Sequence, residues 1–178
     1  MRRSLVCHPS ARGDAIAEVT VDVALDGETL VVAYRIVGTG LRIPDAPLDP
    51  LRLWAHTCGE LFVMPAGGEA YVEHNFSPSG QAARFEFSGY RQRTSAQHAD
   101  AAVVATHDGR TLQIDARAAL PSRVAAARIA LTAVVEDQHG ARSYWALRHP
   151  SERPDFHHPG GFALSLTVGA TPAIVDIA

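Results

Sequence analysis

The sequence predicts an all-β protein, a single antiparallel β-sandwich of about ten strands. Alternation of apolar and polar residues places Val19, Val21 and Val23 on one face of a strand, as expected where one side of a sheet is buried. Turn sequences recur at short intervals, with Asp26-Gly27 and Asp108-Gly109 the clearest hairpin turns. Frequent short strands separated by turns are typical of a sandwich or a barrel.

The other expected strands are rich in β-branched and aromatic residues. They cover residues 28–38, 51–57, 58–64, 70–76, 81–90, 100–108, 110–118, 128–137, 142–149 and 161–168. The Ala-rich stretch from Ala116 to Ala127 is compatible with one helical turn or a short helix, which Pro121 limits. No repeat or linker divides the chain, so we expect one domain over residues 1–178.

Composition excludes several classes of function. The chain has 178 residues, of which 47% are hydrophobic and 20% charged, and its formal net charge is -3. No basic run extends beyond Arg2-Arg3, which argues against nucleic acid as a partner. All 16 basic residues are arginine, so Schiff-base chemistry and a phosphate-binding loop of the Walker type are excluded.

Two observations predict a cytoplasmic protein. No N-terminal segment resembles a signal peptide, and no segment approaches the roughly 20 apolar residues of a membrane span, so no membrane partner is expected. Cys7 and Cys58 are the only cysteines, which gives neither a disulfide framework nor a zinc ribbon. We therefore expect reduced thiols and no cofactor.

One strand face combines carboxylates with aromatic residues. In residues 70–76, Val72, His74 and Phe76 point to the core, while the alternate residues point the other way. With Phe85 and Phe87 facing inward, the neighbouring strands build one polar surface that carries Glu60, Tyr71, Glu73, Asn75 and Arg84. Such a surface is either a binding site or an ordinary solvated sheet face.

The two tryptophans, Trp54 and Trp145, each stand beside a polar aromatic motif. Tryptophan in a β-sandwich usually contributes to the core. The functional alternative is a pair of flat rings that stack on a sugar or another planar ligand, with polar groups around the rim.

Several motifs, taken in order, resemble one family. The set LWAHTCGELFV, YVEHNFSPSG, FSGYR, SYWALRHP and PDFHHPGGF, between about Leu51 and Leu166, is similar to bacterial DOMON-like proteins, which are relatives of family 9 carbohydrate-binding modules. The resemblance implies a sandwich of jelly-roll or immunoglobulin-like type whose members bind sugars or haem. In sugar-binding relatives two aromatic residues clamp the ligand and polar side chains hold its hydroxyls. The matching positions here are Trp54, Glu60, Glu73, Asn75, Arg91 and Trp145.

Gly59 departs from the family pattern, which has a bulky aromatic residue at this position. A missing ring would either open the pocket or loosen the core. Haem-carrying relatives use axial Met and His ligands. Met64 is the only methionine besides Met1, and no CxxCH motif is present.

The histidine-rich segment 143–162 suggests a different class of site. His149, His157 and His158 are candidate metal ligands, joined by Glu152 and Asp155, although no HExxH motif occurs. Ser151, Asp155 and His157 also form a possible hydrolytic triad, without a nucleophile elbow.

Glu60 and Glu73 are a possible glycosidase pair, if burial raises the pKa of one of them. The favoured prediction is a non-catalytic domain that holds a small, sugar-like molecule between Trp54 and Trp145. A metal- or His-dependent hydrolase, a haem domain and a purely structural or partner-binding sandwich remain the alternatives.

Overall fold

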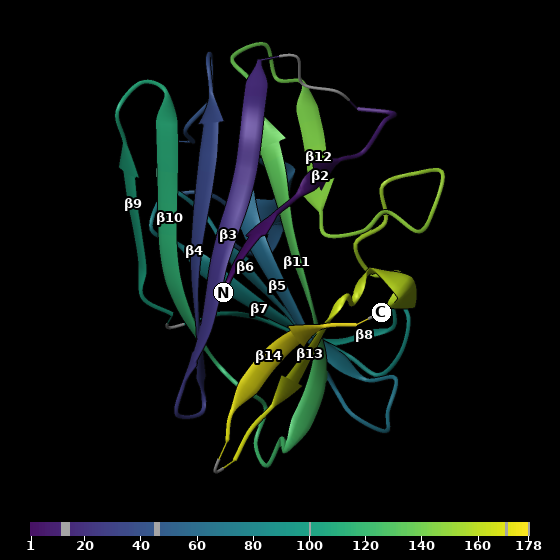
Figure 1. The fold of residues 1–178 in the computed structure, drawn as a ribbon. Helices are drawn as coiled ribbons and strands as arrows, with labels where there is room; N and C mark the ends of the chain where they lie inside the picture. The colour runs from purple at the N-terminus through teal and green to yellow at the C-terminus, as the bar shows by residue number, and fades with distance from the viewer. Residues whose placement is uncertain (12–14, 45–46, 100, 170, 178) are drawn as a thin grey trace.

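Two antiparallel β-sheets pack face to face in a computed structural model that describes residues 1–11, 15–44, 47–99, 101–169 and 171–177 (Figure 1). The first sheet has the order β1-β3-β4-β10-β9, with β1 Arg2–Ser4, β3 Ile16–Asp26, β4 Thr29–Gly38, β9 Val103–His107 and β10 Thr111–Ala119. The predicted β-sandwich is therefore confirmed. Among the described residues, none of the helices is both long and apolar enough to cross a membrane.

The second sheet has nine strands in the order β14-β13-β11-β5-β6-β7-β8, with β12 pairing both β11 and β2. Its strands are β2 Val6–Cys7, β5 Cys58–Pro65, β6 Tyr71–Phe76, β7 Ala82–Phe87, β8 Arg93–His98, β11 Ala126–Glu136, β12 Arg142–Ala146, β13 Leu164–Thr167 and β14 Ala173–Asp176. Both predicted hairpin turns form, with Gly27 and Gly109 at positive φ.

The sequence predictions of individual elements differ from the structure in several places. Residues 51–57 are not a strand, because Asp49 accepts the N–H of Leu51 and Pro50 opens a short 3-10 helix, η1 Pro50–Ala55. The expected strand 81–90 ends at Phe87, and the strands β1, β2, β8 and β14 were not predicted. Asp100, the first residue of another expected strand, lies outside the described residues. The described residues of the Ala-rich stretch form the end of β10, a turn and the start of β11, with no helix.

The core lies between the two sheets and is built by the alternation that the sequence shows. Val21 and Tyr34 are opposite each other on β3 and β4, and Ile114 of β10 follows in register. From the other sheet, Leu61 and Leu131 meet them in the same buried cluster. Full burial of such side chains contributes roughly 1.5–3 kcal/mol each, which makes this layer the main source of stability.

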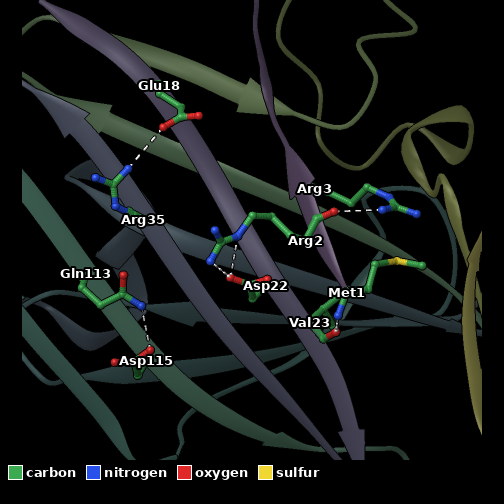
Figure 2. Close-up of polar contacts among 9 residues, drawn as sticks. All are labelled: Met1, Arg2, Arg3, Glu18, Asp22, Val23, Arg35, Gln113 and Asp115. Carbon is green, nitrogen blue, oxygen red and sulfur yellow. Dashed lines mark hydrogen bonds and ion pairs between the residues drawn. The ribbon is translucent and has the colours of Figure 1, made fainter.

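The outer face of the first sheet is polar and solvated. Arg2 pairs with Asp22 and Arg35 pairs with Glu18 across neighbouring strands (Figure 2), at N–O distances of 2.6 and 3.2 Å. Exposed pairs of this kind add at most about 1 kcal/mol each. The outer face of the first sheet is thus an ordinary solvated sheet face.

The outer face of the second sheet is different, because other parts of the chain cover it. Phe62 and Phe87 lie on it, and the ring of His157 packs edge-on against both. Phe162, and Leu53 from η1, belong to the buried cluster that includes these aromatic side chains. The second sheet is thus buried on both faces, and its outer side is a second, smaller core.

This second core explains an error in the predicted faces. Glu60, Tyr71, Glu73 and Asn75 share the outer face as predicted, but Arg84 is directly opposite His74 and lies on the other face. Phe85 and Phe87 stand on the outer face beside the carboxylates. The prediction assumed that aromatic residues point to one core between the sheets, whereas this sheet has apolar residues on both sides.

Candidate functional site

A cleft of about 500 Å³ opens on the outer face of the second sheet. Strands of the sheet form its floor, and η1 and the segment 147–163 stand beside it. Its lining residues are Trp54, Glu60, Glu73, Phe85, Phe87, Arg91, Arg93, Val134, Arg142, Tyr144, Pro154, Phe156 and His157. A cleft with apolar walls and a few polar groups is the usual form of a small-molecule site.

Two carboxyl groups lie on the floor of this cleft. Glu60 of β5 is opposite Asn75 of β6, so Glu60 and Glu73 are diagonal neighbours on adjacent strands. Both are buried, at 3% and 5% exposure. Oε2 of Glu60 accepts the hydroxyl of Thr132 at 3.1 Å, and Oε1 of Glu73 accepts Nδ2 of Asn75 at 3.0 Å.

Burial favours the neutral form of both groups. Loss of solvent raises the pKa of Glu60 well above its usual value, and the charge of Glu73 raises it further against the opposing hydrogen bond from Thr132. Burial also raises the pKa of Glu73 to about 7, against the lowering effects of Asn75, Arg91 and Arg93. The floor therefore carries two acids that cannot both ionise easily near neutral pH.

An aromatic cluster holds His157 beside Glu73. Tyr71 stacks on Phe87 with ring centroids 4.6 Å apart, and its hydroxyl lies 2.8 Å from Nδ1 of His157. That hydroxyl accepts the backbone N–H of Arg91 at 3.2 Å, so we assign it as the donor to Nδ1. The proton of the neutral ring is then on Nε2, which lies 3.8 Å from Oε2 of Glu73. Burial, followed by the charge of Arg91, lowers the pKa of His157 to about 4 despite Asp155, so the ring is uncharged near pH 7.

The loop that carries Arg91 forms part of the rim. Arg91 has a positive φ of 56°, and its guanidinium donates to Asp155 at 2.7 Å. Tyr90 donates to Oδ2 of Asp155, whereas Oδ1, which accepts from Arg91, also accepts the backbone N–H of His157 at 3.2 Å. Asp155 therefore ties the β7–β8 loop to the segment that delivers His157.

The two tryptophans occupy different places. Trp54 stands on η1 at the cleft, 43% exposed, with the guanidinium of Arg52 at 5.9 Å from its ring. Trp145 is opposite Ala133 on the inner face of the second sheet, in the core between the sheets, where Nε1 donates to Ser143. The expected clamp between Trp54 and Trp145 does not form, because successive residues of a strand point to opposite faces and Tyr144 has the cleft side.

The other predicted ligand positions divide in the same way. Glu60, Glu73 and Arg91 line the cleft. Asn75 is fully buried and supports Glu73, and its Oδ1 has no hydrogen-bond partner within the described part of the chain.

Gly59 neither opens the cleft nor loosens the core. It is opposite Ala133 on the inner face, and a Cβ built on it would lie 2.7 Å from the ring of Tyr34. Tyr34 thus fills the space that an aromatic side chain at position 59 would need, and its hydroxyl donates to the carbonyl of Glu60. The aromatic ring in this space therefore belongs to Tyr34 of the opposite sheet and not to residue 59.

The three histidines of the segment 143–162 do not converge. His149 contacts the carbonyl of Val6 through Nε2, and Nδ1 of His158 accepts the N–H of Gly160 at the start of the short helix η2 Pro159–Gly161. Only His157 faces the cleft. Within the ranges that the structure describes, no three His, Cys, Asp or Glu side chains are grouped as metal ligands.

The arrangement of the side chains does not support the hydrolytic triad or the haem site either. The His157 side chain is oriented by Tyr71 and not by Asp155, whose side chain accepts from Tyr90 and Arg91. Met64 packs in the second core. The paired-carboxylate hypothesis has one condition met, since Glu60 and Glu73 are both buried with raised pKa values.

Several residues of the cleft were not predicted from the sequence. Arg93, Arg142, Tyr144 and Phe156 all line it. A signal was present for two of them, because Arg142 and Tyr144 alternate with Trp145 on one strand and must face away from it.

Two solved structures whose names refer to carbohydrate binding have a fold similar to this one. No family model matches the chain, and no curated protein matches it in sequence. A protein of Bacteroides uniformis, provisionally assigned as carbohydrate-binding, is similar with a TM-score of 0.66 and 16% identity over 95% of this chain and 86% of its own. A family 9 carbohydrate-binding module of Caldicellulosiruptor kristjanssonii, solved with glucose, has a TM-score of 0.56 and 12% identity over 91% of this chain and 81% of its own. At these identities the likeness establishes a shared β-sandwich fold.

Proposed function

We propose that the cleft binds a carbohydrate without catalysing a reaction on it. The observation that carries the proposal is the combination of two buried carboxyl groups on the floor with an exposed tryptophan at the edge. Sugars present hydroxyl groups at the rim of the ring and C–H groups on its faces. Such a molecule matches a site with hydrogen-bonding groups below and aromatic surface beside them.

Each lining residue has a role in this proposal. Glu60 and Glu73 accept hydrogen bonds from sugar hydroxyls, and Arg91 donates to a ring or hydroxyl oxygen. Trp54 stacks on a face of the sugar. The second aromatic contact comes from Tyr144 and Phe156, whose rings lie 6.1 Å apart beside the cleft, and not from Trp145.

The structural neighbours support the class of ligand but not its identity. The module of C. kristjanssonii is described with bound glucose, so a domain of this fold can hold a sugar. The resemblance to DOMON-like proteins points to the same class and stays a prediction.

Calorimetry and tryptophan fluorescence with a panel of mono- and oligosaccharides test the proposal. In the Trp145→Phe variant Trp54 is the only tryptophan, and a bound sugar should change its emission while affinity stays within about threefold of wild type. Trp54→Ala should weaken binding roughly three- to tenfold, the loss of one aromatic contact. If no saccharide binds, or if only Trp145→Phe abolishes binding, the proposal is wrong.

A glycosidase is the second candidate, since burial and the charge of Glu73 raise the pKa of Glu60, and burial raises that of Glu73 to about 7. It predicts release of nitrophenol from aryl glycosides that Glu73→Gln abolishes. Binding without any such release favours the non-catalytic proposal.

A further inference from the structure

Three arginines line the cleft, and only one of them is paired with an acidic side chain in the described part of the chain. Arg91, Arg93 and Arg142 line it, and Glu60 and Glu73 are the only acidic lining residues in the described part of the chain. The protein as a whole is acidic, with a formal net charge of -3. The excess of arginine is therefore a local property of this cleft.

Arg93 and Arg142 in particular are available to a ligand. Arg91 is held by Asp155 at 2.7 Å, but neither Arg93 nor Arg142 forms an ion pair within the described ranges. The guanidinium of Arg93 lies over the ring of Phe85, 5.7 Å from its centroid, which holds it against the wall.

The position of Arg142 shows why it has no acidic partner. Its cross-strand neighbour is Glu136. That carboxylate is instead held by Arg42 at 2.9 Å and by His56 at 2.8 Å. Arg42 and His56 thus occupy both carboxylate oxygens of Glu136. Arg142 therefore has no acidic partner there and faces the cleft.

The two floor carboxyls offset this positive charge only in part. Burial favours their neutral forms, and raised pKa values of both groups agree with that. A neutral carboxyl still exchanges hydrogen bonds with hydroxyl groups, whereas a guanidinium offers a planar fork that fits a carboxylate or a phosphate. The floor suits a polyol and the rim suits an anion.

We propose that the ligand of the cleft is an acidic carbohydrate, whose hydroxyl groups meet Glu60 and Glu73 and whose anionic group is bound by Arg93 or Arg142. This inference rests on the proposed function and narrows its ligand class. Carboxylate in a uronic acid and phosphate in a sugar phosphate share the required chemistry. The two arginines stand at opposite rims, on β8 and β12.

The test compares ligands that differ only at C6, namely glucose, glucuronate and glucose 6-phosphate, together with the corresponding galactose series. We expect at least one acidic member to bind ten times or more as tightly as its neutral match. The gain should disappear as NaCl rises from 50 to 500 mM, and the better of the two acid types identifies carboxylate or phosphate as the natural group.

Variants assign the charge to its residue. Arg93→Ala or Arg142→Ala should weaken binding of the acidic ligand at least tenfold while a neutral sugar changes less than threefold. Arg110→Ala, in the exposed β9–β10 turn of the other sheet, is the matched control and should leave binding unchanged. All three side chains are exposed, so the variants should fold normally.

The outcomes separate the two proposals. If neutral sugars bind as tightly as their acidic matches, the ligand is not an acidic carbohydrate, although the cleft still binds sugars. If no saccharide binds, the proposed function fails and this inference fails with it. If inorganic phosphate binds as tightly as every sugar phosphate, the cleft recognises an anion and not a sugar.

Discussion

Replacement of Glu73 by glutamine should stabilise the protein at neutral and alkaline pH. The carboxyl is 5% exposed, and burial raises its pKa to about 7, whereas it is 4.5 in an unperturbed chain. A difference of this size corresponds to about 3 kcal/mol, at 1.36 kcal/mol for each tenfold change in the proton-binding constant. Glutamine keeps the oxygen that accepts from Asn75 but carries no charge.

The sign of the pH dependence follows from the direction of the shift. Below pH 4.5 Glu73 is protonated in both the folded and the unfolded chain, so the substitution has little effect. Between about pH 4.5 and 7 the folded protein holds a proton that the unfolded chain has released, so the free energy of unfolding of the wild type falls as the pH rises. Above pH 7 the whole difference of about 3 kcal/mol is present.

Urea denaturation followed by circular dichroism at pH 4.5, 6 and 8 measures this difference. We expect Glu73→Gln to match the wild type at pH 4.5 and to exceed it by up to about 3 kcal/mol at pH 8, equivalent to roughly 6–12 °C in Tm for a domain of this size. Glu28→Gln, at an exposed turn, is the control and should show no such trend. Equal or lower stability of Glu73→Gln at pH 8 would refute the argument that the folded protein carries an uncompensated acid.

Two further predictions concern the inner face and the ligand. Gly59→Ala should destabilise the protein by roughly 1–3 kcal/mol in the same assay, because its Cβ would lie 2.7 Å from the ring of Tyr34, and Gly68→Ala, in an open turn, should not. Binding of glucuronate should tighten as the pH falls from 8 to 6, because the negative charge of Glu73 is lost as the pH crosses its pKa of about 7. Calorimetry at the two pH values measures the change, and weaker binding at pH 6 would contradict it. The groups around Glu73 do not oppose this trend. Arg91 and Arg93 stay cationic, and the imidazole of His157 is already neutral. The carboxyl of Glu60 has its own pKa raised.

Most of the sandwich could be predicted from sequence, because hairpins carry local signals. Alternation along β3 and the turn at Gly27 are sufficient to define one hairpin without any tertiary information. The same rule placed Glu60 and Glu73 on one face correctly. It failed at Arg84 because alternation divides a strand into two faces but does not say which face is buried when both are.

The cleft itself depends on contacts that sequence does not show. His157 reaches Tyr71 across 86 positions of the chain, and Phe156 reaches the cleft in the same way. Such long-range packing has no periodic signature. Trp145 was misplaced for a simpler reason. The prediction paired the two tryptophans and did not apply strand alternation, which places Tyr144 on the cleft side and Trp145 in the core.

The buried carboxyls are better explained by ligand binding than by stability. A structural role predicts that the fold weakens when the charge of Glu73 is removed, whereas its raised pKa means that the fold gains. Groups that cost the folded state in this way concentrate at functional sites, where a bound molecule supplies the missing partners. A Glu73→Gln protein that is more stable at pH 8 yet binds sugar less tightly would separate the two roles within one side chain.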